Sequence, residues 1–85
     1  MSIKVRNVTL NKEKIMSRMS GARVAQGYSY HDLSLKTGIS KAQLLKMEHD
    51  FSDGTALIHV MAVSKALHID FLYLCGLTDD YKTVE

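Results

Sequence analysis

The chain has 85 residues, of which 46% are hydrophobic, so it can form one domain with a modest core and is too apolar for a disordered composition. No stretch approaches the roughly 18 consecutive apolar residues of a membrane span, and residues 1–10 lack the apolar segment of a secretory signal. The single cysteine, Cys75, excludes an internal disulfide and fits a cytoplasmic location.

The net charge of +2 is distributed unevenly along the sequence. Residues 1–49 hold nine Lys and Arg against three Asp and Glu, a balance of +6, whereas residues 50–85 hold two against six, a balance of −4. A basic half and an acidic half predict one face that meets a polyanion and another that meets solvent or a protein. Chance scatter of charges in a short chain is the alternative.

Residues 1–10 are predicted to form an N-terminal arm. Four apolar residues alternate only loosely there, which leaves open a short strand or a flexible arm. A first helix is expected over about residues 12–26, with Asn11 as its N-cap and Gly27 as its stop. Its core side is formed by residues at helical spacing, namely Ile15, Met19, Ala22 and Ala25.

The stretch from Ser29 to Glu48 predicts two short helices joined by a tight turn. Ser29 with Asp32, and likewise Ser40 with Gln43, have the spacing of a capping box. Gly38 can take the left-handed backbone that ends a helix. The connection is too short for an antiparallel hairpin, so the two helices must cross steeply, as in a helix-turn-helix. Their buried side is expected to contain Leu33, Leu44 and Met47.

A fourth helix is expected over about residues 55–67, and Asp70 should cap a last short helix over residues 71–76. The core side of the fourth helix would consist of Leu57, Val60, Met61, Ser64 and Leu67. Residues 78–85 have the composition of a frayed acidic tail. The sequence therefore predicts an all-α fold, in which a compact five-helix domain over residues 11–77 requires no sheet.

The stretch from Arg23 to Leu74 resembles the lambda-repressor-like helix-turn-helix family, which includes Cro and the phage repressors. The resemblance is carried by the run Leu-x4-Gly-Ile-Ser-x3-Leu-x3-Glu over residues 33–48, together with Lys65-Ala66-Leu67 and Ile69-Asp70. It implies a DNA-binding repressor or Cro-like transcription regulator of phage or prophage origin. The chain departs from the family at Tyr30, where Gln is usual, and at Leu45, where a small polar residue is usual.

The outer face of the helix after Ser40 is the expected DNA-reading surface. In related proteins the positions that match Lys41, Ala42 and Lys46 read bases. We add Gln43 to these expected base readers because of its side-chain chemistry alone. Lys can donate to guanine, Gln can pair with adenine, and Ala can pack on a thymine methyl group, and the first turn of such a helix enters the major groove deepest. The alternative is a merely solvated helix face.

Phosphate contacts are expected at both ends of this helix pair. Ser29 and Tyr30 lie where free backbone N–H groups and the helix dipole favour an anion, and His49 follows the reading helix. Packing of Tyr30 against the reading helix is the alternative for that residue. The resemblance also implies an ion pair between Arg23 and Glu48 that fixes the reading helix, with a surface-exposed Arg23 as the alternative.

The last helix carries more apolar surface than a monomer needs. We expect this surface to form a homodimer interface that places two reading helices about 34 Å apart on a near-palindromic operator. Packing of the N-terminal arm over the patch, through Ile3 and Val5, is the alternative. The expected interface residues are Leu72, Tyr73, Cys75 and Leu77.

Signals for other chemistry are absent from the sequence. The four histidines have no metal-site spacing, and there is no Gly-rich phosphate loop. We therefore expect no metal, cofactor, small-molecule substrate or enzymatic activity. The sequence favours a cytoplasmic, homodimeric repressor that binds double-stranded DNA. The alternative is a protein-interaction module of the same fold, antirepressor-like or antitoxin-like, that does not read DNA.

Overall fold

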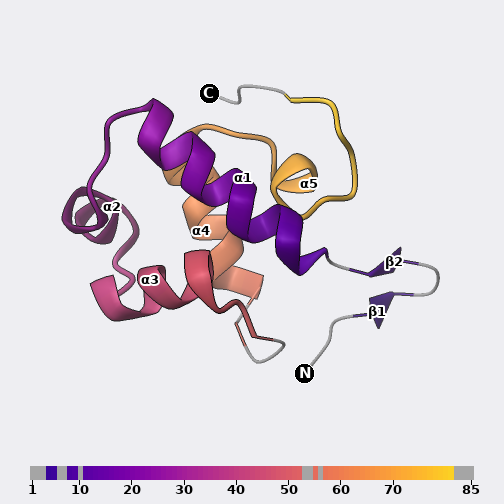
Figure 1. The fold of residues 1–85 in the computed structure, drawn as a ribbon, viewed down its shortest axis with the longest axis horizontal. Helices are drawn as coiled ribbons and strands as arrows, with labels where there is room; N and C mark the ends of the chain where they lie inside the picture. The colour runs from indigo at the N-terminus through magenta and orange to yellow at the C-terminus, as the bar shows by residue number, and fades with distance from the viewer. Residues whose placement is uncertain (1–3, 6–7, 10, 53–54, 56, 82–85) are drawn as a thin grey trace.

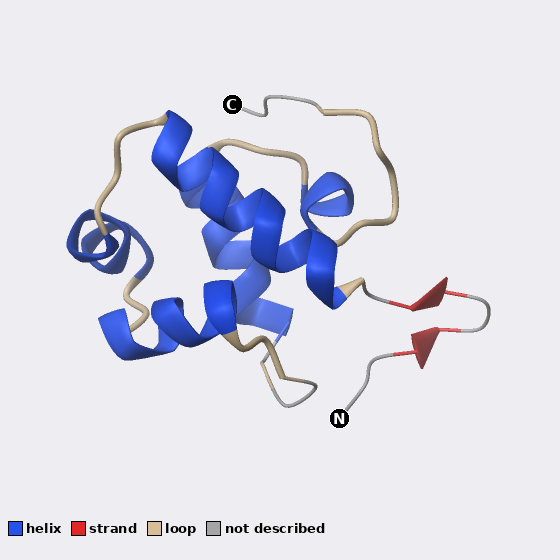
Figure 2. Ribbon diagram, viewed as in Figure 1, coloured by secondary structure: helices blue, strands red, loops and turns tan. Residues whose placement is uncertain are grey.

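The computed structural model describes residues 4–5, 8–9, 11–52, 55 and 57–81. The prediction of an all-α fold with five helices is confirmed in this part of the chain (Figures 1 and 2). The elements in chain order are β1 (Lys4–Val5), β2 (Val8–Thr9), α1 (Lys12–Ala25), α2 (Tyr30–Thr37), α3 (Lys41–His49), α4 (Leu57–Leu67) and α5 (Phe71–Leu74).

The N-terminal segment contains two short strands. β1 and β2 pair antiparallel, with Lys4 opposite Thr9 and Val5 opposite Val8. Of the two alternatives for the N-terminal arm, a short strand or a flexible segment, these residues therefore adopt the strand. Figure 2 shows the hairpin projecting from the helical body next to the start of α1. Ile3, one of the two residues expected to cover the last helix, lies outside the described residues.

The helices pack around one hydrophobic core. α1 contacts α3, α4 and α5, while α2 contacts α3 and α4, so α1 lies between the α2–α3 pair and α5 (Figure 1). The fully buried residues include Ile15, Met19, Leu33, Leu44, Met47, Val60, Val63, Leu67 and Leu74. Most of the positions predicted from helical spacing are therefore buried.

Two predicted core positions are wrong, and one core residue was missed. Ala25, in the last turn of α1, is exposed. Met61 is 44% exposed, while Val63 is fully buried. The buried side of α4 runs through Val60, Val63 and Ser64, so Met61 lies at its flank rather than at its centre. α4 also begins at Leu57, later than predicted.

The predicted helix starts are confirmed by their capping bonds. Asn11 Oδ1 accepts from Lys14 N at 3.0 Å, and Ser29 forms a reciprocal capping box with Asp32. Ser40 and Asp70 also accept from backbone N–H groups of the helices that they precede. Side-chain caps satisfy amide groups that have no partner inside the helix, which explains why α2 and α3 form despite their shortness.

Three helix ends use the same left-handed closure. Each has a backbone hydrogen bond from the residue after the left-handed position to the carbonyl five residues earlier, namely Tyr28 to Arg23, Ile69 to Ser64 and Leu77 to Leu72. The left-handed residues are Gly27, His68 and Gly76, with φ of 75°, 55° and 78°. His68 is thus a non-glycine residue in a left-handed backbone conformation that glycine adopts most readily.

Replacement of His68 by glycine is expected to raise the free energy of unfolding by about 0.5–1 kcal/mol, because the strain of the left-handed backbone is relieved while the closing hydrogen bonds remain. Urea and thermal unfolding followed by circular dichroism would measure this gain. Lys65→Gly is the matched control, since an exposed glycine inside α4 should instead destabilise by about 1 kcal/mol. Equal losses in both variants would contradict strain at His68.

The segment after α5 is held against α1, in contrast to the predicted frayed tail. Asp79 accepts from Lys14 Nζ at 2.8 Å and from Arg18 Nη2 at 2.6 Å. The Arg18 guanidinium lies 4.0 Å from the centre of the Tyr73 ring, and the Tyr81 ring packs edge-on against Tyr73 at 5.1 Å. The two cations of α1 thus fix residues 78–81, while residues 82–85 of the predicted tail lie outside the described part of the chain.

Candidate nucleic-acid interface

The turn between α2 and α3 sets the orientation of α3. Gly38 closes α2 with φ of 75°, and Ser40 starts α3 two residues later. Ile39 between them is only 6% exposed and anchors the turn in the core. Leu44 and Met47 are fully buried on the inner face of α3. Hydrophobic burial on this side leaves the opposite side of α3 open to a partner.

The outer face of α3 presents most of the predicted base readers. Lys41, Ala42 and Lys46 are exposed, whereas Gln43 is half-buried. Ala42, Lys46 and His49 follow each other at the spacing of one helix face. Leu45 is 37% exposed, so the apolar departure from the family lies at the margin of this surface.

Arg23 and Glu48 join α1 to the C-terminal end of α3. Arg23 Nε donates to Glu48 Oε2 at 2.7 Å, and Nη2 donates to Oε1 at 3.3 Å. Arg23 Nη1 also donates to the backbone oxygen of Tyr28 at 2.8 Å. Glu48 is 5% exposed, so its charge depends on this partner, and the hydrogen bond raises the pKa of Arg23 above its ordinary value.

Tyr30 extends this pair into a network at the start of α2. Its hydroxyl donates to Glu48 Oε1 at 2.9 Å and lies 3.1 Å from His49 Nε2. The Arg23 guanidinium lies over its ring, 4.1 Å from the centre. Burial, followed by the hydrogen bond to Glu48, raises the pKa of Tyr30. The geometry therefore favours the packing alternative for Tyr30 over a hydroxyl that is free to bind phosphate.

Ser29 is engaged in the cap of α2 through both its backbone and its side chain. Its Oγ accepts from Asp32 N at 3.0 Å, and its own N–H donates to Asp32 Oδ2 at 3.0 Å. The backbone and side-chain hydrogen bonds from Ser29 lower the pKa of Asp32. The Asp32 carboxylate beside the Ser29 hydroxyl opposes a phosphate, so an anion here would depend on the first backbone N–H groups of α2.

Comparison with known proteins decides the family. The model of the family described as Cro/C1-type HTH DNA-binding domain matches residues 18–80. The chain belongs to this family. It is a helix-turn-helix DNA-binding transcription regulator of the Cro/C1 type, and its family is one of DNA-binding regulators rather than enzymes. The resemblance seen in the sequence is thereby confirmed.

A solved structure shares the Cro/C1-type fold. The restriction-modification controller protein C.AhdI from Aeromonas hydrophila superimposes with a TM-score of 0.66 at 22% sequence identity. The similar region covers 74% of this chain and 94% of that chain. No curated protein matches the sequence.

The residues predicted for a dimer interface have different surroundings in this Cro/C1-type domain. Leu72 and Leu77 are 51% and 41% exposed. Tyr73 is half-buried between Arg18 and Tyr81.

Cys75 is fully buried, so its assignment to an interface is wrong. It faces the core because α5 is so short that its closing turn folds back onto α1, where Asn11 N donates to the Cys75 oxygen. Burial, and then the nearby Asp70, raises the pKa of its thiol to about 11.

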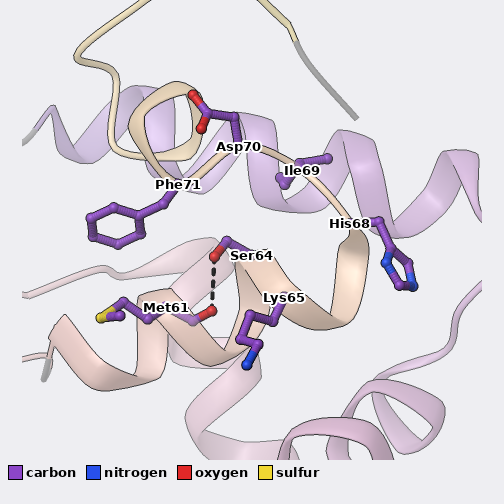
Figure 3. A pocket seen from close by; sticks show the side chains of 7 residues that line it. All are labelled: Met61, Ser64, Lys65, His68, Ile69, Asp70 and Phe71. Atoms are coloured by element: carbon purple, nitrogen blue, oxygen red, sulfur yellow. Dashed lines mark hydrogen bonds between the residues drawn. The ribbon is translucent and has the colours of Figure 1, made fainter. Parts of the chain in front are cut away.

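A pocket of about 440 Å³ lies between α4 and α5. Figure 3 shows Met61 and Phe71 at one end and Lys65 and His68 at the other, and Ser64 Oγ donates to the Met61 oxygen at 2.8 Å. The remaining lining residues are Ile69 and Asp70.

The described residues contain neither a metal-site cluster nor a helix that could span a membrane. Among residues 4–5, 8–9, 11–52, 55 and 57–81, no three His, Cys, Asp or Glu side chains gather as a metal site. No helix of the same ranges is long and apolar enough to cross a membrane.

Two features of the site were missed in the sequence. The first is Tyr30 as the centre of the network between α2 and α3. Its signal was the tyrosine in place of the usual Gln, at the first position of a helix pair that ends with Glu48 and His49. The second is Arg18, which binds the segment after α5. That role has no local sequence signal, because its partners lie about 60 positions away.

Proposed function

We propose that this chain is a sequence-specific repressor that binds a near-palindromic operator as a homodimer, with α3 in the major groove. The observation that carries this proposal is the outer face of α3, where Lys41, Ala42 and Lys46 are exposed. The inner face of the same helix is fixed by buried Leu44 and Met47. A rigid helix with a polar, cationic outer face meets the requirements for reading base edges.

The four readers would contribute different contacts. Lys41 and Lys46 can donate to guanine, and Ala42 can pack on a thymine methyl group. Gln43 can pair with adenine, and its partial burial restricts it to the base pair nearest the first turn. Phosphates on either side would be bound at Ser29 by the first N–H groups of α2, and by His49. Tyr30 would act through its backbone N–H and through His49 rather than through its hydroxyl.

Dimerisation is proposed through α5. Leu72 and Leu77 supply exposed apolar area, and the pocket beside Phe71 offers a recess for side chains of the second copy. Tyr73 would lie at the edge of this interface, and Cys75 would support it from the core. α5 lies across α1 from α3 (Figure 1), so a symmetric pair would keep both reading helices free.

The biological setting is proposed on the resemblance to Cro and the phage repressors, which suggests a phage or prophage regulator acting in the cytoplasm. The similar structure is named as a controller protein of a restriction-modification system. Either setting requires the same dimeric reading of an operator, so one binding experiment tests both.

Selection of bound duplexes from a random pool tests the proposal. We expect enrichment of a near-palindrome whose half-sites are centred about 10 base pairs apart, because two reading helices of a dimer are spaced by one helical turn of DNA. Affinity for the selected site should fall steeply with salt, with a slope of about −0.9 for each neutralised phosphate. Failure to retain any duplex at low salt would refute DNA binding, and a single half-site without symmetry would refute the dimer.

A further inference from the structure

His49 is the outer member of a chain of hydrogen bonds that begins in the core. Arg23 donates to Glu48 from α1, Tyr30 donates to Glu48 from α2, and the Tyr30 oxygen lies 3.1 Å from His49 Nε2. The inner members are well shielded, since the Glu48 side chain has 0% and the Arg23 side chain 13% relative exposure. His49 itself is exposed. A buried network thus holds one nitrogen of a surface imidazole.

The chemistry of the three partners determines where the protons lie. A phenol has one proton, and the Glu48 carboxylate, held in its ionised form by Arg23, only accepts. The Tyr30 proton is therefore directed to Glu48 at 2.9 Å, and the contact with His49 requires a donor on Nε2. Nε2 consequently carries a proton in both the neutral and the charged ring, and the neutral ring has a bare Nδ1.

The position of His49 gives this assignment a consequence for DNA binding. His49 follows Ala42 and Lys46 on the same face of α3, and it lies at the end where the network joins the first residue of α2. The start of α2 is a place where phosphates approach, because its free N–H groups and the helix dipole favour an anion. A bare Nδ1 repels a phosphate oxygen, whereas a protonated Nδ1 donates to it and adds a positive charge.

We propose that Tyr30 is a positioning residue that holds His49 by Nε2, so that the His49 imidazolium, but not the neutral ring, binds a DNA phosphate. The proposal rests on the proposed function, because it names the partner of a phosphate contact at the same surface. It makes DNA binding take up a proton at His49. Affinity should therefore rise as the pH falls and His49 takes up this proton, and should lose the contribution as the pH rises.

The other charges around His49 decide how strong the effect is. The charges next to His49 along the chain are the Asp50 carboxylate and, one turn earlier, the Lys46 ammonium group. The charge of Glu48 is already neutralised by Arg23. His31, in the first turn of α2, is a second exposed imidazole that could meet the same phosphates. The charged and titratable groups of the surroundings are Arg23 from α1, Tyr30, His31 and Asp32 from α2, Lys46 and Glu48 from α3, and Asp50.

Binding of a labelled duplex with the selected site, measured at about pH 5.5 and about pH 8, tests the inference. The unaltered chain should bind about fivefold tighter at the lower pH at low salt. Its salt slope should be steeper there by about 0.9, the value for one more phosphate. The His49→Gln variant should lose both the tighter binding and the steeper salt slope at the lower pH. Tyr30→Phe, which keeps the ring beneath Arg23, should lose most of both, while the matched control His31→Gln should keep them.

A second measurement examines the positioning without DNA. Nitrogen NMR shifts of the His49 ring should show the neutral tautomer with its proton on Nε2, and Tyr30→Phe should give a mixture of tautomers. A pH profile that is unchanged in His49→Gln or in Tyr30→Phe would overturn the inference, as would a neutral ring protonated on Nδ1. If neither the unaltered chain nor any variant binds a duplex, the proposed function fails. The NMR result would then still test whether Tyr30 positions the His49 ring.

Discussion

Replacement of both Lys41 and Lys46 by alanine is expected to lower the affinity for the selected operator by about a hundredfold or more. Each good contact between a side chain and a base edge contributes about 1–3 kcal/mol, so the loss of two such contacts exceeds a factor of one hundred near the middle of that range. Fluorescence anisotropy with a labelled duplex would measure it. Both side chains are exposed, so thermal unfolding should change little.

The matched control for this double variant is Lys36→Ala. Lys36 is also an exposed helical lysine, but it lies on α2 over the Tyr28 ring and belongs neither to the proposed DNA contacts nor to the proposed dimer interface. Its removal should change the affinity by less than about twofold, because it lies outside the proposed footprint. Operator affinity that is unchanged in the double lysine variant would move the DNA site off α3.

The single variants distinguish a base contact from a phosphate contact. A lysine that reads a base should, when removed, relax the preference at one position of the selected site. A lysine that binds a phosphate should weaken binding equally on all sequences and reduce the salt slope by about one. The position of Lys41 in the first turn favours a base contact. Lys46 lies one turn later, between Ala42 and His49 on the same face of α3.

Local signals in the sequence were sufficient for the helices and for the turn that joins α2 and α3. A cap requires only a side chain and an amide group three residues later, so Asn11, Ser29 and Ser40 could be recognised without any knowledge of the fold. Gly38 likewise fulfils a backbone requirement that is local. The identity of the inner face of α3 followed from helical spacing alone.

Predictions that depended on distant partners were less successful. Cys75 was expected at the surface, because spacing within a four-residue helix cannot show that the following turn folds onto the start of α1. The segment after α5 was expected to fray, because the cations that hold Asp79 lie on α1. Tyr30 was expected to face a phosphate, but Glu48 offers its hydroxyl an ionised acceptor that only the packed fold brings within reach.

Replacement of Arg23 by alanine is expected to lower the free energy of unfolding by about 3 kcal/mol, because it leaves the Glu48 carboxylate buried without its cation. Two further contacts are lost with it, the bond to the Tyr28 oxygen and the packing on the Tyr30 ring. For a domain of this size the midpoint of thermal unfolding should fall by about 15 °C. Urea unfolding followed by circular dichroism gives the free energy directly.

The loss of stability in Arg23→Ala should come mainly from the Glu48 carboxylate that is left buried without a partner, rather than from the lost attraction between the two charges. Two further variants separate these two contributions. In Lys14→Ala, an exposed pair is broken, and Asp79, with 77% side-chain exposure, keeps Arg18 and water as partners, so the expected cost is below about 1 kcal/mol. In Arg23→Met with Glu48→Met, no charge is left in the core, and more than half of the lost stability should return. Equal losses in the single and double variants would instead assign the stability to the attraction between the two charges. Because the pair joins α1 to α3, the single variant should also weaken operator binding at temperatures where the domain is still folded.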